Sequence, residues 1–322
     1  MEKIPVIVVA GATASGKTAL AVSLARRFGG EVISADSMQI YQGMAIATAK
    51  PTEEEKREVP HHLMDFLPVT DTYSVARYVE DANRIAGEIA ARGNVPIVAG
   101  GTGLYIDSLI DNIMFEDEPD NSAVRAALRE RREKEGIEAL FAELERVDPE
   151  TAAQLHINNE NRVLRALEVY ELTGETISER RRRSRLKESR FDAVWIGLDY
   201  RNRQLLYDRI DRRVDNMLAR GLLEEARAYY QLPKAATASQ AIGYKELRGY
   251  FSGELTLEEA ADNLRRATRR YAKRQLTWFR KNERIHWIYR DNKNEEETVE
   301  EAAVLAAAGL FQQTGGAGRY ER

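Results

Sequence analysis

The chain contains no cysteine among its 322 residues, which excludes disulfide bonds and any zinc or iron–sulfur centre held by thiolates. Long hydrophobic runs are absent too, since no window approaches the roughly 18 consecutive apolar residues that a membrane-spanning helix needs. The first residues, MEKIPVIVVAG, place an acid and a base before a short apolar run, which is typical of a buried first strand and not of a signal peptide. We therefore expect a cytoplasmic protein that does not enter a membrane.

The chain also lacks a net positive charge, because 48 Lys and Arg against 52 Asp and Glu give a formal charge of -4. Two local runs depart from this average. Residues 265–281 carry eight Lys or Arg and no acid, and residues 180–190 carry seven basic residues and one Glu. A single run of this kind is most simply a solvated helix face. Two runs, with Tyr271, Trp278 and Phe279 interleaved in one, favour RNA binding, because neutralised phosphates release counterions.

Short runs rich in Val and Ile alternate with stretches of helical periodicity. The runs predict buried parallel strands at 4–10, 31–35, 95–100, 193–199 and 284–290. The first helices are expected at 17–28 and 74–92. This alternation predicts an α/β fold, a doubly wound core like that of P-loop NTPases with a parallel sheet.

The strand signal disappears between residues 118 and 188, where short helical patterns follow one another with Gly or Asp-Pro between them. The sequence therefore predicts an all-helical insertion domain at 118–188. The α/β core would consist of 1–117 and 189–322, and it is expected to be helical almost throughout after residue 202.

GATASGKT, residues 11–18, has the G-x-x-x-x-G-K-T spacing of a phosphate-binding loop, between an expected strand and an expected helix. In such a loop successive backbone N–H groups point at phosphate oxygens, and the helix N-terminus adds positive charge. Lys17 supplies a mobile cation, and Thr18 offers a hydroxyl to Mg²⁺. The motif does not say what carries the phosphates.

Two further strands end in residues of interest at the same sheet edge. Asp36 follows the second strand, and three roles are open to it: helix cap or turn, partner of a metal ion, or general base. The strand at 95–100 ends in GGTG, where glycines let a backbone approach a ligand and Thr102 contributes a hydroxyl. No acid ends this strand, which counts against a conventional ATPase.

The helical segment 204–225 places Arg209 and Arg213 on one face. Its acids Asp208, Asp211 and Asp215 are expected to pair with these arginines on the surface. The adjacent His61 and His62 do not predict a metal site, because no carboxylate is suitably spaced.

Eight segments in this order resemble the tRNA dimethylallyltransferase family of bacterial type: GATASGKT, DSMQIYQGMAIATAKP, PHHLMD, GGTGLY, NRVLRALEV, RIDRRVDNMLARGL, AIGYKE and YAKRQLTWFR. The resemblance runs from about residue 4 to 290. One departure is Ala12, where Pro is common in the family. The family's activity implies that the loop holds the diphosphate of dimethylallyl diphosphate. The acceptor would be N6 of the adenosine immediately 3′ of the anticodon, flipped out of its stack.

The resemblance implies a role for each matching position. Asp36 would be the general base, with Lys17, Thr18, Thr102 and Arg213 as the other catalytic residues and Mg²⁺ as cofactor at Thr18. The implied diphosphate-binding residues are Gly11, Ala12, Thr13, Ala14, Ser15, Gly16, Lys17, Thr18 and Arg213. The implied tRNA-binding residues are Asp36, Ser37, Met38, Gln39, Thr102, Arg125, Asn161, Arg162, Val163, Leu164, Arg165, Gln240, Ala241, Ile242, Gly243, Tyr244, Lys245, Lys273, Arg274, Gln275, Trp278 and Arg280.

The implied partners are the tRNA anticodon stem-loop and dimethylallyl diphosphate, and we expect a monomer with no obligate protein partner. Three alternatives stay open. A P-loop kinase or ATPase acting on a small molecule explains the loop but not the basic aromatic run at 265–281. The second alternative is prenylation of free adenine nucleotides, which would leave the two basic runs without a role. A non-enzymatic RNA-binding module has no use for the phosphate-binding loop.

Overall fold

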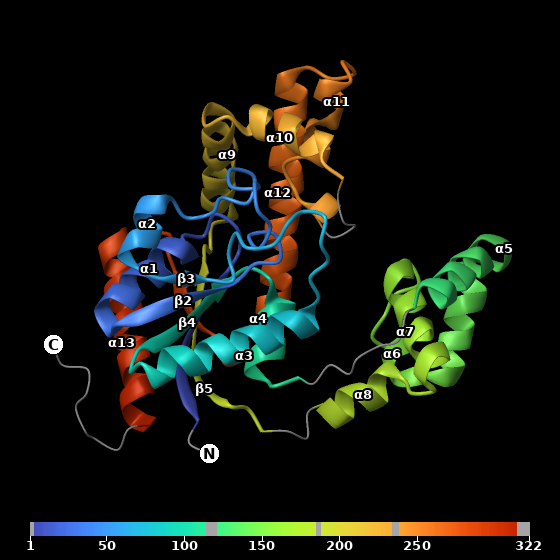
Figure 1. Cartoon of the computed structure of the whole chain (residues 1–322), viewed down its shortest axis with the longest axis horizontal. Helices are drawn as coiled ribbons and strands as arrows, with labels where there is room; N and C mark the ends of the chain where they lie inside the picture. Colours follow the sequence, from blue (N-terminus) through green and yellow to red (C-terminus); the bar gives the residue numbers. More distant parts are fainter. Residues whose placement is uncertain (1–2, 114–120, 185–187, 234–237, 314–322) are drawn as a thin grey trace. The chain divides into compact units, whose positions relative to one another are not determined.

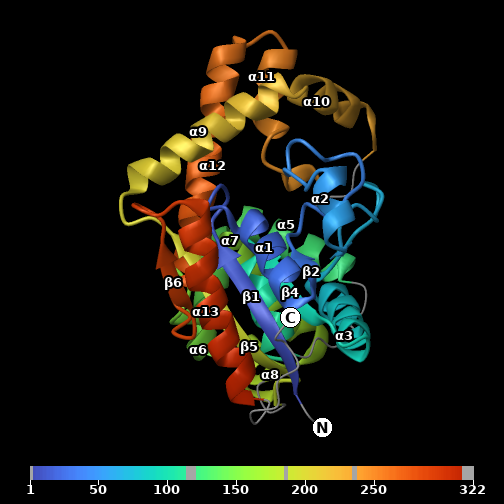
Figure 2. The same ribbon diagram turned by 90° about the vertical axis from the view of Figure 1, so that its left-hand side faces the viewer.

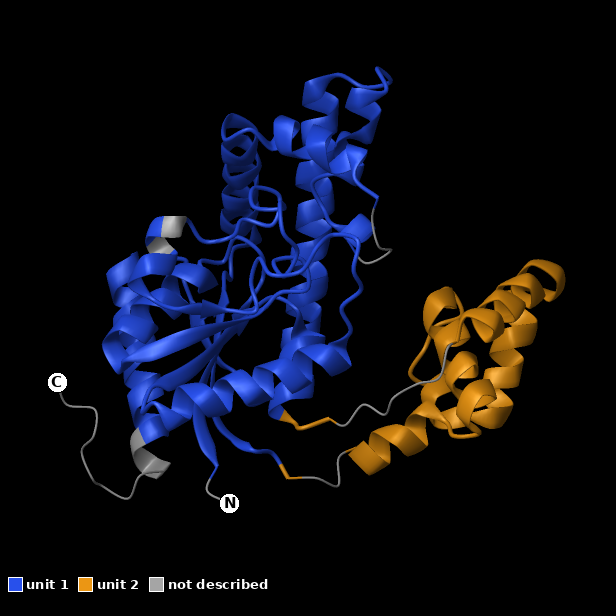
Figure 3. Cartoon of the chain, viewed as in Figure 1, with its two compact units in different colours: residues 1–110, 189–322 blue, residues 111–188 orange. Residues whose placement is uncertain are grey.

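The structure is a computed structural model that describes residues 3–113, 121–184, 188–233 and 238–313. It divides into two compact units: unit 1 consists of residues 1–110 and 189–322, and unit 2 of residues 111–188 (Figure 3). The boundary expected at residue 118 lies outside the described residues. No helix of the described ranges has the length and apolar character needed to cross a membrane.

The centre of unit 1 is a six-stranded sheet in which every pair of neighbouring strands is parallel. The strand order β3-β2-β4-β1-β5-β6 is that of a doubly wound α/β fold, so the predicted fold class is confirmed. The sequence missed only β3, whose two residues are too short to show a pattern. The strands are β1 (Ile4–Gly11), β2 (Gly30–Ala35), β3 (His61–His62), β4 (Val95–Gly100), β5 (Phe191–Asp199) and β6 (His286–Tyr289).

Helices cover both faces of this sheet (Figure 1). Alternate side chains of the central strands point to opposite faces, and each set is buried in its own hydrophobic cluster. One face packs against α1 (Lys17–Phe28) and α13 (Glu295–Gln313). The other packs against α3 (Val75–Ala91), α4 (Gly103–Ile110) and part of α12 (Leu257–Phe279).

The remaining helices of unit 1 lie beyond the carboxyl ends of the strands (Figure 2). The long helices α9 and α12 pack side by side there, and α12 begins with a capping box formed by Thr256 and Glu259. The helical segments are α9 (Arg203–Ala219), α10 (Leu222–Gln231), η1 (Ala238–Gln240), η2 (Lys245–Leu247) and α11 (Arg248–Phe251), with α2 (Glu53–Glu58) nearer the sheet.

Unit 2 is all-helical in its described residues, as predicted, and its apolar side chains form a separate cluster around Leu140, Leu144 and Leu167. Its first helix breaks at Gly136, whose φ of 84° and ψ of 164° no helix accommodates. The two helical patterns on either side of this glycine are therefore two helices in space. The segments are α5 (Ser122–Val147), α6 (Pro149–Ala152), α7 (Glu160–Thr173) and α8 (Ile177–Ser184).

We predict that Gly100→Ala lowers the free energy of unfolding by about 3 kcal/mol, the upper end of the cost of overpacking. A Cβ at Gly100 would lie 2.1 Å from the Ala35 carbonyl oxygen on the neighbouring strand, and that oxygen is backbone and cannot rotate away. The matched control is Gly87→Ala in α3, where an added Cβ meets nothing within 4 Å. The control should gain about 0.5–1 kcal/mol from helix propensity. Urea unfolding measures both, and equal stabilities of the two variants would contradict the close approach of β2 and β4.

Candidate active site

The phosphate-binding loop follows β1 directly and leads into α1 at Lys17. Two of its residues have positive φ, Ala14 at 63° and Gly16 at 97°, and the Ser15 N–H donates to the Ala12 carbonyl at 3.2 Å. Such a turn is typical of phosphate-binding loops, in which backbone N–H groups line the inner side next to the helix N-terminus. The predicted strand–loop–helix context of GATASGKT is therefore present.

One part of the loop differs from the prediction. The N–H of Thr13 donates to Gln275 Oε1 of α12 at 2.8 Å, and Gln275 Nε2 donates in turn to the Gly101 carbonyl at 2.9 Å. The Thr13 N–H therefore already has a partner and is not open to a phosphate oxygen. Gln275 is 5% exposed, so its amide joins the loop to the end of β4. Thr13, which was expected to contact diphosphate, and Gln275, which was expected to contact tRNA, therefore contact each other.

Asp36 stands at the carboxyl end of β2, and its turn role is real: Oδ1 accepts the N–H of Met38 at 2.9 Å. The following residue is held as well, because the Ser37 N–H donates to Thr102 Oγ1 at 3.1 Å. The N–H of Thr102 in turn donates to the Ala35 carbonyl at 3.1 Å, which holds Thr102 in place. The ends of β2 and β4 are thereby joined, as expected for two strands that end at one edge.

A cavity of about 350 Å³ opens in unit 1 beside the loop and the end of β2. It brings together side chains from five segments that are distant in sequence. The lining residues are Thr13, Lys17, Thr18, Asp36, Ser37, Met38, Gln39, Ala47, Thr48, Ala49, Arg213, Val214, Met217, Gln240, Ala241, Ile242, Gly243, Lys245, Leu264, Thr268, Tyr271, Arg274 and Gln275. One part of the wall is charged, and another, formed by Met, Val, Leu, Ile and Ala, is apolar.

Of the four cationic side chains that line the cavity, Lys17 and Arg213 interact electrostatically with its one carboxylate, Asp36. Burial lowers the pKa of Lys17 to about 8; the negative charge of Asp36 partly opposes this shift and the positive charge of Arg213 adds to it. Burial likewise lowers the pKa of Arg213, again opposed by Asp36. Burial and the Asp36 charge together raise the pKa of Tyr271. The site therefore carries excess positive charge, which suits it to a polyanion.

Two charged residues that the sequence did not single out, the partly buried Glu225 and the buried Lys50, hold the wall formed by residues 44–50. Glu225 of α10 accepts the N–H groups of Ile46 at 2.7 Å and Ala47 at 2.9 Å, and the Tyr244 hydroxyl at 2.8 Å. Lys50, 6% exposed, pairs with Asp65 at 2.5 Å. No sequence signal separates these from ordinary surface charges, because their partners are remote.

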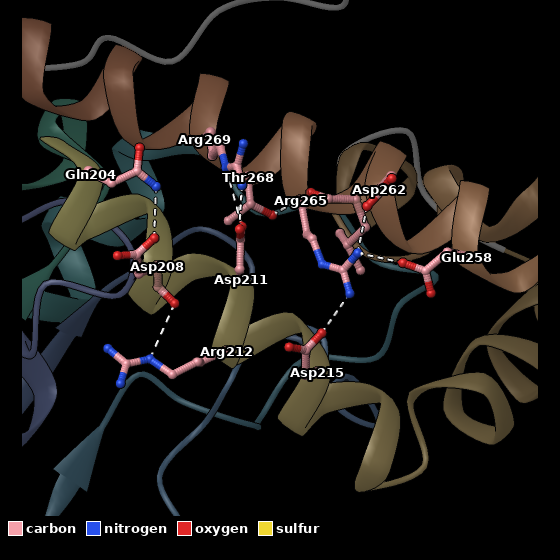
Figure 4. A network of polar contacts seen from close by, with 11 residues as sticks. Gln204, Asp208, Asp211, Arg212, Asp215, Glu258, Asp262, Arg265, Thr268 and Arg269 are labelled. Atoms are coloured by element: carbon pink, nitrogen blue, oxygen red, sulfur yellow. Dashed lines mark hydrogen bonds and ion pairs between the residues drawn. The ribbon is translucent and has the colours of Figure 1, made fainter.

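The acids of α9 do not pair with Arg209 and Arg213 as expected; two of them pair with α12 instead (Figure 4). Asp215 binds Arg265 at 2.7 Å, and Arg269 donates to the two carboxylate oxygens of Asp211 from Nε and Nη2. Arg265 also contacts Asp262 and Glu258. These pairs fix α9 against α12 and leave Arg213 facing the cavity.

The basic run of α12 is consequently divided. Arg265 and Arg269 are neutralised by acids, whereas Lys273 and Arg274 are exposed. Two other predicted tRNA-binding residues have protein partners: the Trp278 Nε1–H donates to Asp107 at 2.7 Å, and Arg280 pairs with Asp199 at 2.6 Å. Of the segment 240–245, Tyr244 is buried, and its neighbours line the cavity.

The predicted tRNA-binding residues of unit 2 fall into two groups. Asn161 and Arg162 are exposed, whereas Val163 is fully buried in the core of that unit with Leu164 packed beside it. Arg125 and Arg165 both pair with the buried carboxylate of Glu168. In the arginine-rich run, Arg181, Arg182 and Arg183 contact Gln154, Glu150 and Glu175, and Arg185 and Lys187 lie outside the described residues.

Among the described residues, no group of three or more His, Cys, Asp or Glu stands ready to hold a metal ion. His62 Nε2 pairs with Glu31 at 2.7 Å, and His61 Nδ1 lies 2.7 Å from the Val59 carbonyl oxygen.

The chain matches two family models: the one described as IPP transferase over residues 39–282, and the one described as isopentenyl transferase over residues 4–72. It is 44% identical over 312 residues to the tRNA dimethylallyltransferase of Caldanaerobacter subterraneus subsp. tengcongensis, covering 96% of this chain and 99% of that protein. Two solved structures are similar. The tRNA isopentenylpyrophosphate transferase of Bacillus halodurans has a TM-score of 0.73 at 41% identity, covering 97% of this chain and 99% of that one. A eukaryotic dimethylallyltransferase acting on tRNA has a TM-score of 0.77 at 29% identity, covering 96% and 79%.

We predict that Lys17 titrates near pH 8 in the free protein and not near its ordinary value of 10.5. Asp36→Asn should lower the Lys17 pKa further, because it removes a stabilising negative charge, and Arg213→Gln should raise it, because it removes a repelling positive one. NMR titration of reductively ¹³C-methylated protein measures these values, with Lys17→Arg identifying the signal. A Lys17 pKa that neither substitution changes would contradict the arrangement of the three charges.

Proposed function

Because the chain belongs to the IPP transferase family, whose model matches residues 39–282, we propose that it transfers a dimethylallyl group to tRNA. The donor would be dimethylallyl diphosphate, and the acceptor N6 of the adenosine 3′-adjacent to the anticodon. The observation that carries this proposal is the cavity itself, which brings together a phosphate-binding loop, the cations Lys17 and Arg213, a single carboxylate and several apolar side chains. That combination matches an allylic diphosphate and a base that receives a proton.

The diphosphate would bind against the loop N–H groups other than those of Thr13 and Ser15, which already have partners, with Lys17 and Arg213 neutralising its charge. As the allylic C–O bond breaks, negative charge grows on the leaving diphosphate, and fixed positive groups stabilise it. The apolar residues Val214, Met217 and Leu264 offer a surface to the five-carbon group. Thr102, fixed between Ser37 and the end of β2, would lie near the breaking bond.

Asp36 would take the proton from N6 as the new C–N bond forms. The exocyclic amine is a weak nucleophile because its lone pair is delocalised into the ring, so removal of its proton aids attack. Since Oδ1 is held by the Met38 N–H, the carboxyl group has a fixed orientation at the cavity wall. Adenine reaches this position only when it is flipped out of the anticodon stack.

Mg²⁺ fits this donor set. The Thr18 hydroxyl and the Asp36 carboxylate both line the cavity, and Mg²⁺ is commonly held by one or two protein oxygens together with phosphate oxygens and water. When bound, the ion would withdraw charge from the diphosphate. Lys17, Arg213 and the loop N–H groups remain the protein's own means of holding that group.

The exposed basic residues Lys273 and Arg274 of α12, and Asn161 and Arg162 of unit 2, would contact the anticodon arm. We place the activity in the cytoplasm, where tRNA is available, and propose a monomer without an obligate protein partner. Residues of the predicted set whose side chains are buried, such as Val163 and Tyr244, would support the tRNA surface by packing.

One assay separates this function from its rivals. The protein is incubated with labelled dimethylallyl diphosphate and unmodified tRNA, AMP or ATP, and we expect label in tRNA alone. Lys17→Ala should abolish transfer, because it removes the loop's only side-chain cation. Label in AMP or ATP would indicate prenylation of free nucleotides. Robust phosphate release from ATP without tRNA or prenyl donor would indicate a kinase or ATPase and contradict the proposal.

We predict that Asp36→Asn lowers turnover by about 10² to 10⁴, the usual cost of losing a general base. Asparagine keeps the size and the acceptor for the Met38 N–H, so the turn and the affinity for tRNA should persist. Single-turnover kinetics and filter binding measure the two effects. Recovery of full activity at saturating magnesium would instead assign Asp36 to the metal ion and leave the base unassigned.

A further inference from the structure

Two arginines outside the cavity bind the outer side of the phosphate-binding loop. The Arg209 Nε–H of α9 donates to the Ala14 carbonyl at 2.9 Å, and Arg290, just after β6, donates from Nη1 to the Ser15 carbonyl at 2.8 Å. Neither arginine lines the cavity. The sequence placed Arg209 on the face of Arg213 and gave Arg290 no role.

The geometry of the loop explains why these carbonyls need donors. When successive N–H groups turn inward to meet an anion, the intervening carbonyls turn outward. Buried carbonyls without donors are costly, so their partners stabilise this one conformation of the loop. Ala14 also requires support of its own, because its φ is positive and a non-glycine residue rarely adopts that conformation.

Arg290 is built into the protein and is not a chance surface contact. It is 6% exposed, its own N–H donates to the Asp199 carbonyl, and Nη2 pairs with Glu295 at 2.6 Å. Its Nη1 occupies the space beside Gly16, where an added Cβ would lie 2.0 Å from it. Arg209 lies against the buried ring of Tyr200 at 5.9 Å. Both guanidinium groups therefore bind loop carbonyls from positions outside the cavity lining.

We propose that Arg209 and Arg290 are positioning residues that hold the phosphate-binding loop with its N–H groups inward, and that they thereby set the affinity for the diphosphate. This proposal rests on the proposed function for the identity of the ligand. The two guanidinium groups act through the loop backbone, without touching the substrate, and their positive charge adds to the attraction of the site for the anion.

The test compares Arg290→Met and Arg209→Met with the control Arg212→Met. Arg212 is an exposed arginine of α9 whose Nε–H donates only within its own helix, to the Asp208 carbonyl, in the interactions described. We expect the Kd for inorganic diphosphate and the KM for dimethylallyl diphosphate to rise about 10- to 100-fold in the first two variants, the size typical of losing a supporting residue. The control and the affinity for tRNA should stay at the parent's values.

Lysine variants separate positioning from simple folding. Arg290→Lys and Arg209→Lys keep the positive charge and replace the guanidinium by an ammonium group that can still donate to the carbonyl. They should therefore regain part of the diphosphate affinity. Circular dichroism confirms the fold of each variant, and if Arg290→Met does not fold, the less buried Arg209 carries the test. Unchanged diphosphate affinity in folded Met variants, or an equal loss of tRNA affinity, would overturn the proposal. Binding of inorganic diphosphate requires no turnover, so failure of the prenyl transfer assay is a separate result.

Discussion

The site depends on one constraint: the register that aligns the carboxyl ends of β2, β4 and β1. Ala35 pairs with Gly100, and Gly100 pairs with Ala10, so the three strands end at the same level. The phosphate-binding loop, Asp36 and Thr102 all follow within a few residues of that level. Only glycine at position 100 allows the backbones to approach so closely, and the hydrogen bonds of Thr102 then fix the adjoining turns.

Much of this edge could be predicted from the sequence, because the relevant rules are local. A short Val- and Ile-rich run fixes a buried strand, and a polar residue directly after it must lie at the carboxyl edge of a parallel sheet. The structure brings Lys17 and Asp36 to one cavity and places Thr102 against the turn that follows Asp36. The sequence pattern also identified the all-helical segment now seen as unit 2, where Gly136 ends one helix and starts another.

The rest depends on contacts between residues that are remote in sequence, for which one sequence carries no signal. Gln275 meets Thr13 across 262 positions, and Arg290 meets Ser15 across 275. Charge patterns were misleading for the same reason: Asp211, two residues from both Arg209 and Arg213 on α9, instead binds Arg269 of α12. Of the basic residues of α12, Arg265 and Arg269 are therefore paired with acids of α9, which the sequence alone does not show.

In the sequence, unit 2 lies between β4 and β5, and this order has a consequence for folding while the chain is being synthesised. Strand β1 is central in the finished sheet, with β4 on one side and β5 on the other, and Ile4 pairs with Phe191. While the ribosome is still synthesising unit 2, β1 has only β4 beside it and presents an open edge of Val and Ile residues. Such an edge readily pairs with other chains. The interval needed to synthesise unit 2 is thus the period in which the nascent protein is most exposed to aggregation.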